Sequence, residues 1–192
     1  MEDKIKVLAL FGESASGKDT IQKYITTQWP DWCNSIVSCT TRPKRDYEID
    51  GIDYHFLTNA EFAEKVLNLS MLEATEFNDW FYGTPIDSLK PDMLNVGVFN
   101  PNGIRALLTD SRIQVLPLYV YASDKTRLLR SLSREENPNC YEICRRYMAD
   151  VKDFDELDFD YCVIDNGAEM DKEAIESYVF DFNYYCPNTL IK

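Results

Sequence analysis

A glycine-rich stretch near the N-terminus, GESASGKDT, has residue types and spacing that suit phosphate binding. It fits the pattern G-x-x-x-x-G-K-[ST] at Gly12, Gly17 and Lys18. The glycines permit a tight turn, whose amides would point inward as an anion nest at a helix start. A plain glycine turn between a strand and a helix is the alternative. The residues expected to hold a nucleoside triphosphate are Gly12, Ser14, Ala15, Ser16, Gly17, Lys18, Asp19 and Thr20.

Asp19 departs from this pattern, because it places a carboxylate where the pattern has a hydroxyl. Mg²⁺ prefers hard oxygen ligands and often takes a carboxylate, and the helix dipole favours an anion in the first turn. A cation between Asp19 and a triphosphate would reverse their repulsion. We therefore predict that Asp19 is a direct or water-mediated Mg²⁺ ligand. The alternative is that Asp19 only caps the helix, while phosphates, waters and Thr20 serve the metal.

A second stretch, SCTTRPKRDYEIDGIDYHF, gathers two arginines, a glutamate and two tyrosines in a loop that turns at a glycine. Guanidinium groups bind phosphate oxygens through two parallel hydrogen bonds, and tyrosine hydroxyls add hydrogen bonds without charge. A solvated charged loop is the plain alternative, but it would not explain why cations cluster here in so acidic a chain. The stretch therefore indicates a second phosphate site.

The order S-x-T-T-R-x-x-R-x-x-E-x-x-G-x-x-Y-x-F after a glycine loop resembles the guanylate kinase family, over nearly the whole chain. The resemblance implies transfer of the γ-phosphoryl group of ATP to GMP or dGMP, with Mg²⁺ as cofactor. By position, the residues that would hold the GMP phosphate are Arg42, Arg45, Tyr54 and Tyr82. Those that would face guanine are Ser38, Glu73 and Thr84. Glu48 would brace the arginines rather than touch substrate.

Basic residues are also concentrated in a later segment, at Lys125, Arg127, Arg130, Arg134, Arg145 and Arg146. Arg127, Arg130 and Arg134 have the spacing of one helix face, and a solvated basic face is the plain alternative. The resemblance instead implies a lid in which Arg130, Arg134 and Arg146 clamp ATP and the transferring phosphoryl group. Together with Lys18 they would be the catalytic residues, because phosphoryl transfer depends on positioning and charge neutralisation. Asn166 resembles the family's adenine contact.

Two positions depart from the family, which usually has an aspartate-containing DxD segment where this chain has Val98 and Asn100. Asn100 could still accept a hydrogen bond in the GMP site, but it is neutral. Guanine selectivity and part of the metal shell are therefore in question. One alternative is a nucleoside monophosphate kinase of relaxed base choice. The other is an inactive guanylate-kinase-like binding module, although such modules tend to lose the loop lysine and the lid arginines that this chain keeps.

The elements that must position these residues alternate between strands and helices at both ends of the chain, which predicts a parallel α/β sheet flanked by helices. Strands are expected at residues 4–12, 34–41, 52–57, 70–77, 79–83, 95–99, 113–122 and 158–166. Helices are expected at residues 18–29, 58–66, 100–110, 123–134, 140–154 and 171–185. We predict one guanylate-kinase-like domain over residues 1–192. Its parts are a core (1–37, 86–122 and 155–192), a small antiparallel insertion for the monophosphate (about 38–85) and a helical lid (about 123–154).

The overall composition argues against several classes of function. The chain of 192 residues has a net charge of −13, whereas nucleic-acid-binding proteins are usually basic, so no nucleic-acid partner is expected. It has no apolar run long enough to span a membrane. Its six cysteines form no C-x-x-C pair, which favours free, mostly buried thiols in a reducing cytoplasm. We expect a cytoplasmic monomer or homodimer whose partners are ATP and GMP or dGMP.

Overall fold

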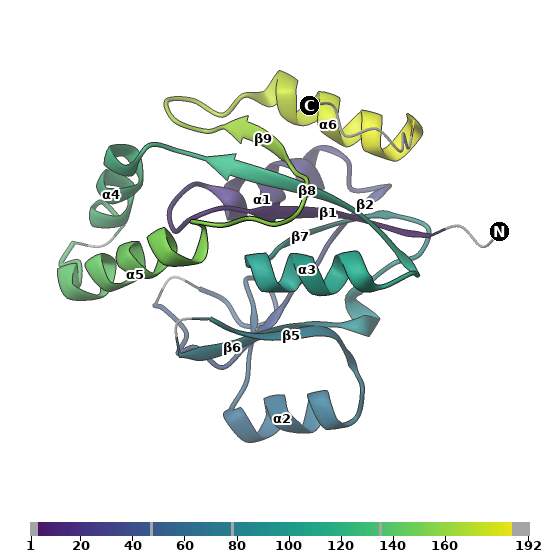
Figure 1. Cartoon of the computed structure of the whole chain (residues 1–192), viewed down its shortest axis with the longest axis horizontal. Helices are drawn as coiled ribbons and strands as arrows, with labels where there is room; N and C mark the ends of the chain where they lie inside the picture. The colour runs from purple at the N-terminus through teal and green to yellow at the C-terminus, as the bar shows by residue number, and fades with distance from the viewer. Residues whose placement is uncertain (1–3, 47, 78, 135, 186–192) are drawn as a thin grey trace.

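The computed structural model describes residues 4–46, 48–77, 79–134 and 136–185, and it has a parallel five-stranded core sheet (Figure 1). The strands of this sheet, in spatial order, are β2 (Cys33–Ser35), β7 (Leu94–Val98), β1 (Ile5–Phe11), β8 (Ile113–Tyr121) and β9 (Cys162–Asp165). Every pairing within it is parallel. The predicted fold class is therefore confirmed for the core.

Helices cover both faces of the core sheet, which explains why its central strand is apolar and buried from Val7 to Phe11. Leu8 and Leu10 of β1 pack in one cluster with α1 (Lys18–Gln28) and α6 (Lys172–Phe180). Val7, Ala9 and Phe11 alternate with them and pack on the other face with α3 (Pro101–Thr109). Figure 1 shows α3 and α6 on opposite sides of the sheet. The carboxyl end of β1 is fixed from both sides, and it leads directly into the glycine loop.

A second, mostly antiparallel sheet of four strands forms the predicted insertion, below the core in Figure 1. Its strands, in spatial order, are β4 (His55–Phe56), β3 (Cys39–Thr40), β6 (Trp80–Pro85) and β5 (Met71–Phe77). Helix α2 (Asn59–Leu67) begins at Thr58, whose hydroxyl accepts from the Glu61 amide while the Glu61 carboxylate accepts from the Thr58 amide. This reciprocal cap fixes the start of the helix at Asn59, one residue after the predicted start.

The single strand predicted at residues 34–41 is wrong, because the chain there belongs to two different sheets. Cys33–Ser35 pairs with β7 of the core, and the Ile36 amide still donates to Val96 O. Beyond this point the chain enters the insertion, where Cys39–Thr40 pairs with β4 and β6. A continuous apolar run cannot reveal such a change of partner, which depends on contacts distant in sequence. The strand predicted at 52–57 is also shorter, at His55–Phe56.

Two helices, α4 (Asp124–Leu132) and α5 (Cys140–Asp153), form the predicted lid beside the glycine loop. Helix α4 ends at Leu132, two residues earlier than expected, and Ser133 is its C-cap, whose amide and hydroxyl both donate to Leu129 O. Arg134 therefore lies beyond the helix, and the predicted common face of three arginines is wrong. Arg127 and Arg130 share α4, but Arg127 is buried.

The described cysteines are free thiols: Cys33, Cys39 and Cys162 are buried, whereas Cys140 and Cys144 are exposed on α5. Cys186 lies outside the described residues. Within the described ranges, none of the helices combines the length and apolarity needed to cross a bilayer.

Candidate active site

The glycine loop between β1 and α1 has the tight backbone that the sequence predicts. Gly12 and Gly17 have φ angles of 144° and 103°, and Ala15 has a φ of 62°. A Cβ atom on Gly12 would lie 2.5 Å from Val120 O, and one on Gly17 would overlap the Asn166 amide group. Both glycines are therefore required by backbone conformation and by close packing.

Arg130 and Asn166 hold the far side of the glycine loop. Asn166 Nδ2 donates to Ser16 O at 2.7 Å, and Arg130 Nη1 donates to the same oxygen at 3.2 Å. Arg130 Nη2 also donates to Asn166 O at 2.8 Å and Gly167 O at 3.1 Å. These contacts tie α4 and the end of β9 to the loop. The side chains of Arg130 and Asn166, both predicted to contact the nucleotide, therefore lie against the glycine loop.

Lys18 and Asp19 begin α1 and differ in their surroundings. Lys18 Nζ donates to Gly12 O at 2.8 Å and to Glu13 O at 2.9 Å, and burial lowers the pKa of its ammonium group. Asp19 and Thr20 are exposed in the first turn of the helix. In the described part of the chain, no three carboxylate, thiol or imidazole groups are arranged to hold a metal ion. The metal role of Asp19 stays a prediction.

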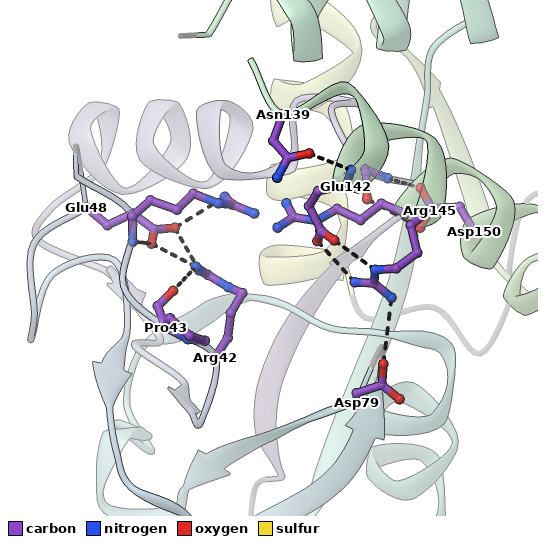
Figure 2. Close-up of polar contacts among 11 residues, drawn as sticks. Arg42, Pro43, Glu48, Asp79, Asn139, Glu142, Arg145 and Asp150 are labelled. Carbon is purple, nitrogen blue, oxygen red and sulfur yellow. Dashed lines mark hydrogen bonds and ion pairs between the residues drawn. The ribbon is translucent and has the colours of Figure 1, made fainter. Parts of the chain in front are cut away.

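Glu48 is the centre of the arginine cluster in the insertion (Figure 2). Its two carboxylate oxygens accept from Arg42 Nη2 at 2.7 Å and Arg42 Nη1 at 3.0 Å, and they also contact the Arg45 guanidinium and amide. Burial disfavours its charge, but the hydrogen bonds from Arg42 and Arg45 outweigh this and lower the pKa of Glu48. Glu48 therefore braces both arginines, as expected.

A cavity of about 120 Å³ lies between the insertion and the core. Residues expected to bind GMP line it, and the glycine loop closes one end. Its predicted members are Gly12, Ser14, Lys18, Ser38, Tyr54, Glu73, Tyr82 and Asn100. Thr84 lies directly behind Glu73, and Arg42 packs over the ring of Tyr54 at 5.5 Å. The structure thus brings most of the predicted monophosphate residues together around one cavity, whereas Arg45 lines a different one.

Glu73 is a buried carboxylate in this cavity, and its side chain has an unusual protonation equilibrium. The residue is 8% exposed, and its Oε1 accepts from Thr84 Oγ1 at 2.7 Å. Burial raises the pKa of Glu73 to about 7, although the hydrogen bonds from Thr84 oppose this. The carboxylate therefore becomes more favourable when a ligand supplies further N–H donors.

Asn100 makes one hydrogen bond with the protein at each end of its side-chain amide. Its Oδ1 accepts from the Gly103 amide at 2.8 Å and caps α3, and its Nδ2 donates to Thr75 Oγ1 at 2.7 Å. One donor and one acceptor site of the Asn100 amide therefore remain, and Glu73 supplies a carboxylate to the same cavity. Thr75 also lines the cavity, and sequence analysis missed it because nothing in the motif marks this position.

A second cavity, the lid cavity, has a volume of about 90 Å³ and lies between the glycine loop and the lid. The predicted residues that line it are Ser14, Arg45, Arg134 and Arg146. Glu142 on α5 accepts from Arg145 Nε at 2.8 Å and Arg146 Nε at 2.6 Å, and these hydrogen bonds, that from Arg145 foremost, lower the pKa of Glu142 to about 2. Figure 2 shows Glu142 on α5 and Glu48 on the insertion, each holding arginines near this cavity.

The lid also touches the insertion directly. Arg145 Nη1 lies 3.9 Å from Asp79 Oδ2, and its guanidinium group lies 5.5 Å from the centre of the Trp80 ring (Figure 2). Sequence analysis noted Arg145 as part of a basic segment but assigned it no contact. The lid cavity therefore lies between three parts of the chain: the glycine loop, the insertion and the lid.

A parallel sheet with this loop, insertion and lid defines an α/β protein of the nucleotide kinase type. The profile of the guanylate kinase family matches residues 4–181. The guanylate kinase of Synechococcus elongatus is 31% identical over 183 residues, which are 91% of this chain and 97% of that protein. The guanylate kinase of Mycoplasmoides gallisepticum is 28% identical over 185 residues, or 92% of this chain and 93% of that protein. The chain belongs to the guanylate kinase family, and it is a guanylate kinase-type enzyme.

Two further comparisons concern the fold and a shorter match. A crystal structure of guanylate kinase from Anaplasma phagocytophilum has a TM-score of 0.67 and 22% identity, and the match covers 98% of this chain and 90% of that chain. It supports the fold. Disks large homolog 2 of Rattus norvegicus is 45% identical over 74 residues, which are 38% of this chain and only 9% of that protein.

The buried carboxylate of Glu73 predicts a pH-dependent stability. Its pKa of about 7 in the folded protein exceeds the ordinary 4.5, so the folded state binds more protons between these values and stability falls as pH rises through them. We expect the free energy of unfolding of Glu73→Gln, relative to wild type, to rise by about 3 kcal/mol from pH 4.5 to pH 7.5, because the variant has no carboxylate to ionise. Urea denaturation across this range measures it. Glu76→Gln, an exposed position on the same strand, is the control, and a pH-independent effect of Glu73→Gln would contradict the prediction.

Proposed function

We propose that this enzyme transfers the γ-phosphoryl group of ATP to GMP or dGMP, giving ADP and GDP or dGDP. The observation that carries the proposal is that the two cavities meet at Ser14 on the glycine loop, which lines both. A phosphate bound on the loop would therefore lie between the arginines of one cavity and the monophosphate residues of the other. This is the arrangement that an in-line transfer between two nucleotides requires.

The donor side of the reaction uses the loop amides and Lys18. Lys18 Nζ now bonds to two loop carbonyls, and it would turn toward the outer phosphates of ATP. Arg134 and Arg146, which line the lid cavity, would neutralise the charge that spreads over the transferring phosphoryl group. Arg130 would hold the loop, and Asn166 would lie near adenine.

The acceptor side uses the insertion. Arg45 lines the lid cavity, and Tyr54 and Tyr82 line the cavity between the insertion and the core. These three side chains would hold the phosphate of GMP between them. Arg42 supports them through Glu48. Glu73 would accept from guanine N1–H and the 2-amino group together, with Thr84 and Ser38 beside it. Adenine offers no such pair of donors, and it would leave the buried carboxylate unpaired.

The donor set at the start of α1 fits Mg²⁺, because Asp19 is an exposed carboxylate next to Lys18 and Thr20 offers a hydroxyl. Magnesium usually keeps several waters and takes one or two carboxylates together with substrate phosphates. Bound there, it would neutralise charge on the triphosphate. Asp19, directly or through water, would hold it, and Lys18 would hold the phosphates.

The three parts of the chain suggest how water is excluded. We infer that the described residues of three ranges, 1–37, 86–122 and 155–192, form a rigid core, while those of the insertion at about 38–85 and of the lid at about 123–154 move toward it. The Arg145 contacts with Asp79 and Trp80 support such a closure, because they join the lid to the insertion without passing through the core.

The free thiols of the described cysteines support a reducing, cytoplasmic setting.

A nucleoside monophosphate kinase of relaxed base choice is the second candidate. Asn100 favours it, because a neutral amide stands where the family usually has a carboxylate, and each end of this amide already bonds to the protein, at Gly103 and Thr75. A binding module without activity is less well supported, since the chain retains Lys18 and the lid arginines.

Substrate choice tests the proposal. With ATP and Mg²⁺, GMP and dGMP should be phosphorylated well above AMP, CMP and dTMP in an assay coupled to ADP release. Glu73→Gln should lower kcat/KM for GMP by about 100-fold or more, because the amide can accept from only one of the two guanine donors and turns its own N–H group toward the other. Glu76→Gln should change it little. Equal turnover of AMP and GMP would favour relaxed base choice, and no turnover of any monophosphate would contradict the kinase proposal.

Metal dependence tests Asp19. Asp19→Asn should raise the Mg²⁺ concentration for half-maximal rate by about 10-fold and lower kcat, while KM for GMP stays nearly unchanged. Asp19→Ser should keep substantial activity, because it restores a hydroxyl ligand. Asp31→Asn, an exposed carboxylate beyond the same helix, is the control. An unaltered Mg²⁺ requirement in Asp19→Asn would leave Asp19 without a role in metal binding.

A further inference from the structure

Ser14 of the glycine loop is held at both of its backbone polar groups by the lid. Its amide donates to Asp150 Oδ2 of α5 at 2.8 Å, and its carbonyl oxygen accepts from Arg127 Nε of α4 at 3.1 Å. Arg127 and Asp150 also bond to each other, with Arg127 Nη2 and Asp150 Oδ2 at 3.0 Å. The three residues form a closed set of contacts that joins two lid helices to one loop residue.

This ion pair is among the most deeply buried charges in the described protein. The side chains of Arg127 and Asp150 are 4% and 1% exposed. Arg127 has further partners in Asp124 at 3.1 Å and Glu13 at 3.6 Å, and its guanidinium lies over the ring of Tyr147. The pair is therefore locked in one geometry by several neighbours.

Fold stability alone is a poor explanation for such a pair. Burial raises the pKa of Asp150, even though the Ser14 amide, Lys18 and Arg127 all favour its charged form. Taking the Asp150 carboxylate out of water therefore costs more than its contacts return, and well-packed apolar residues often serve stability as well as a buried ion pair or better. What the pair provides, and apolar residues cannot, is a directional hold on the two backbone groups of Ser14.

The position of this hold matters for the arginines of the lid. Arg146 lies four residues before Asp150 on α5, and Arg130 lies three residues after Arg127 on α4. Side chains at these spacings share a helix face. Fixing Asp150 and Arg127 on Ser14 thus sets how far Arg146 and Arg130 stand from the glycine loop.

We propose that Asp150, paired with Arg127, is a positioning residue for phosphoryl transfer: it fixes the glycine loop and helix α5 relative to each other, so that Arg146 meets the phosphate bound on the loop. The proposal rests on the proposed kinase function. Asp150 acts through Ser14 and Arg146 and not through chemistry of its own. A carboxylate beside a triphosphate is tolerated there because Arg127 balances its charge.

The test removes both charges together, with Arg127→Met and Asp150→Ala combined, and compares the result with each single variant. The single variants should lower the melting temperature, because each leaves a buried group unpaired. The double variant should recover to within about 4 °C of wild type, yet its kcat with ATP and GMP should stay about 100-fold lower, with KM for GMP changed little. If kcat recovers together with stability, the pair has only a structural role and the proposal is wrong. Asp153→Asn, another carboxylate of α5, is the matched control and should behave like wild type.

A second measurement separates this inference from the kinase proposal. Hydrogen exchange of the Ser14 amide should be slow in wild type and in Asp153→Asn, and at least about 10-fold faster in the double variant. If wild type phosphorylates neither GMP nor dGMP, the proposed function fails, while the exchange result still decides whether Asp150 fixes the loop. Rapid exchange in wild type would overturn the positioning role whatever the activity.

Discussion

The close packing of the glycine loop is the constraint on which the rest of the site depends. Gly12 lies against the backbone of β8, and Gly17 lies against Asn166 at the end of β9, so neither position accepts a side chain. The loop is therefore fixed to the core sheet before any ligand binds. Because its amides are the expected phosphate donors, every other part of the site must be placed relative to this loop, and the lid reaches it through Arg127, Arg130 and Asp150.

The chain is strongly acidic, with a net charge of −13, and yet its site depends on concentrated positive charge. In three places a carboxylate holds the cations: Glu48 holds two arginines of the insertion, Glu142 holds two of the lid, and Asp150 holds Arg127. Each carboxylate removes rotational freedom from long side chains before substrate arrives. Such preorganisation suits a reaction that depends on positioning and charge neutralisation more than on proton transfer.

Much of this arrangement could be predicted from sequence, because short motifs carry it. The glycine loop, the Arg42–Glu48 brace and the alternating strands and helices are all visible at short range in the chain. The strand break after Ser35 could not be seen in this way, because it depends on which sheet each residue pairs with.

Long-range contacts explain the residues that sequence analysis missed. Ser14 and Asp150 are 136 residues apart, and Asn100 and Thr75 are 25 apart. The missed residues are Asp150 and Thr75, and each gains its role only from the partner that the fold brings to it. Arg127 illustrates the reverse: its spacing predicted a helix face shared with Arg130 and Arg134, but its side chain is buried beside Asp150.

In the proposed complex, one phosphate chain would run from the glycine loop to the insertion, between the arginines of the lid. A crystal structure with Mg²⁺ and a bisubstrate analogue, in which adenosine and guanosine are joined by five phosphates, tests this most directly. We expect guanine against Glu73, and the phosphates between Lys18 and the side chains of Arg45 and Arg146. Guanine bound away from Glu73, or phosphates that bypass the glycine loop, would contradict it.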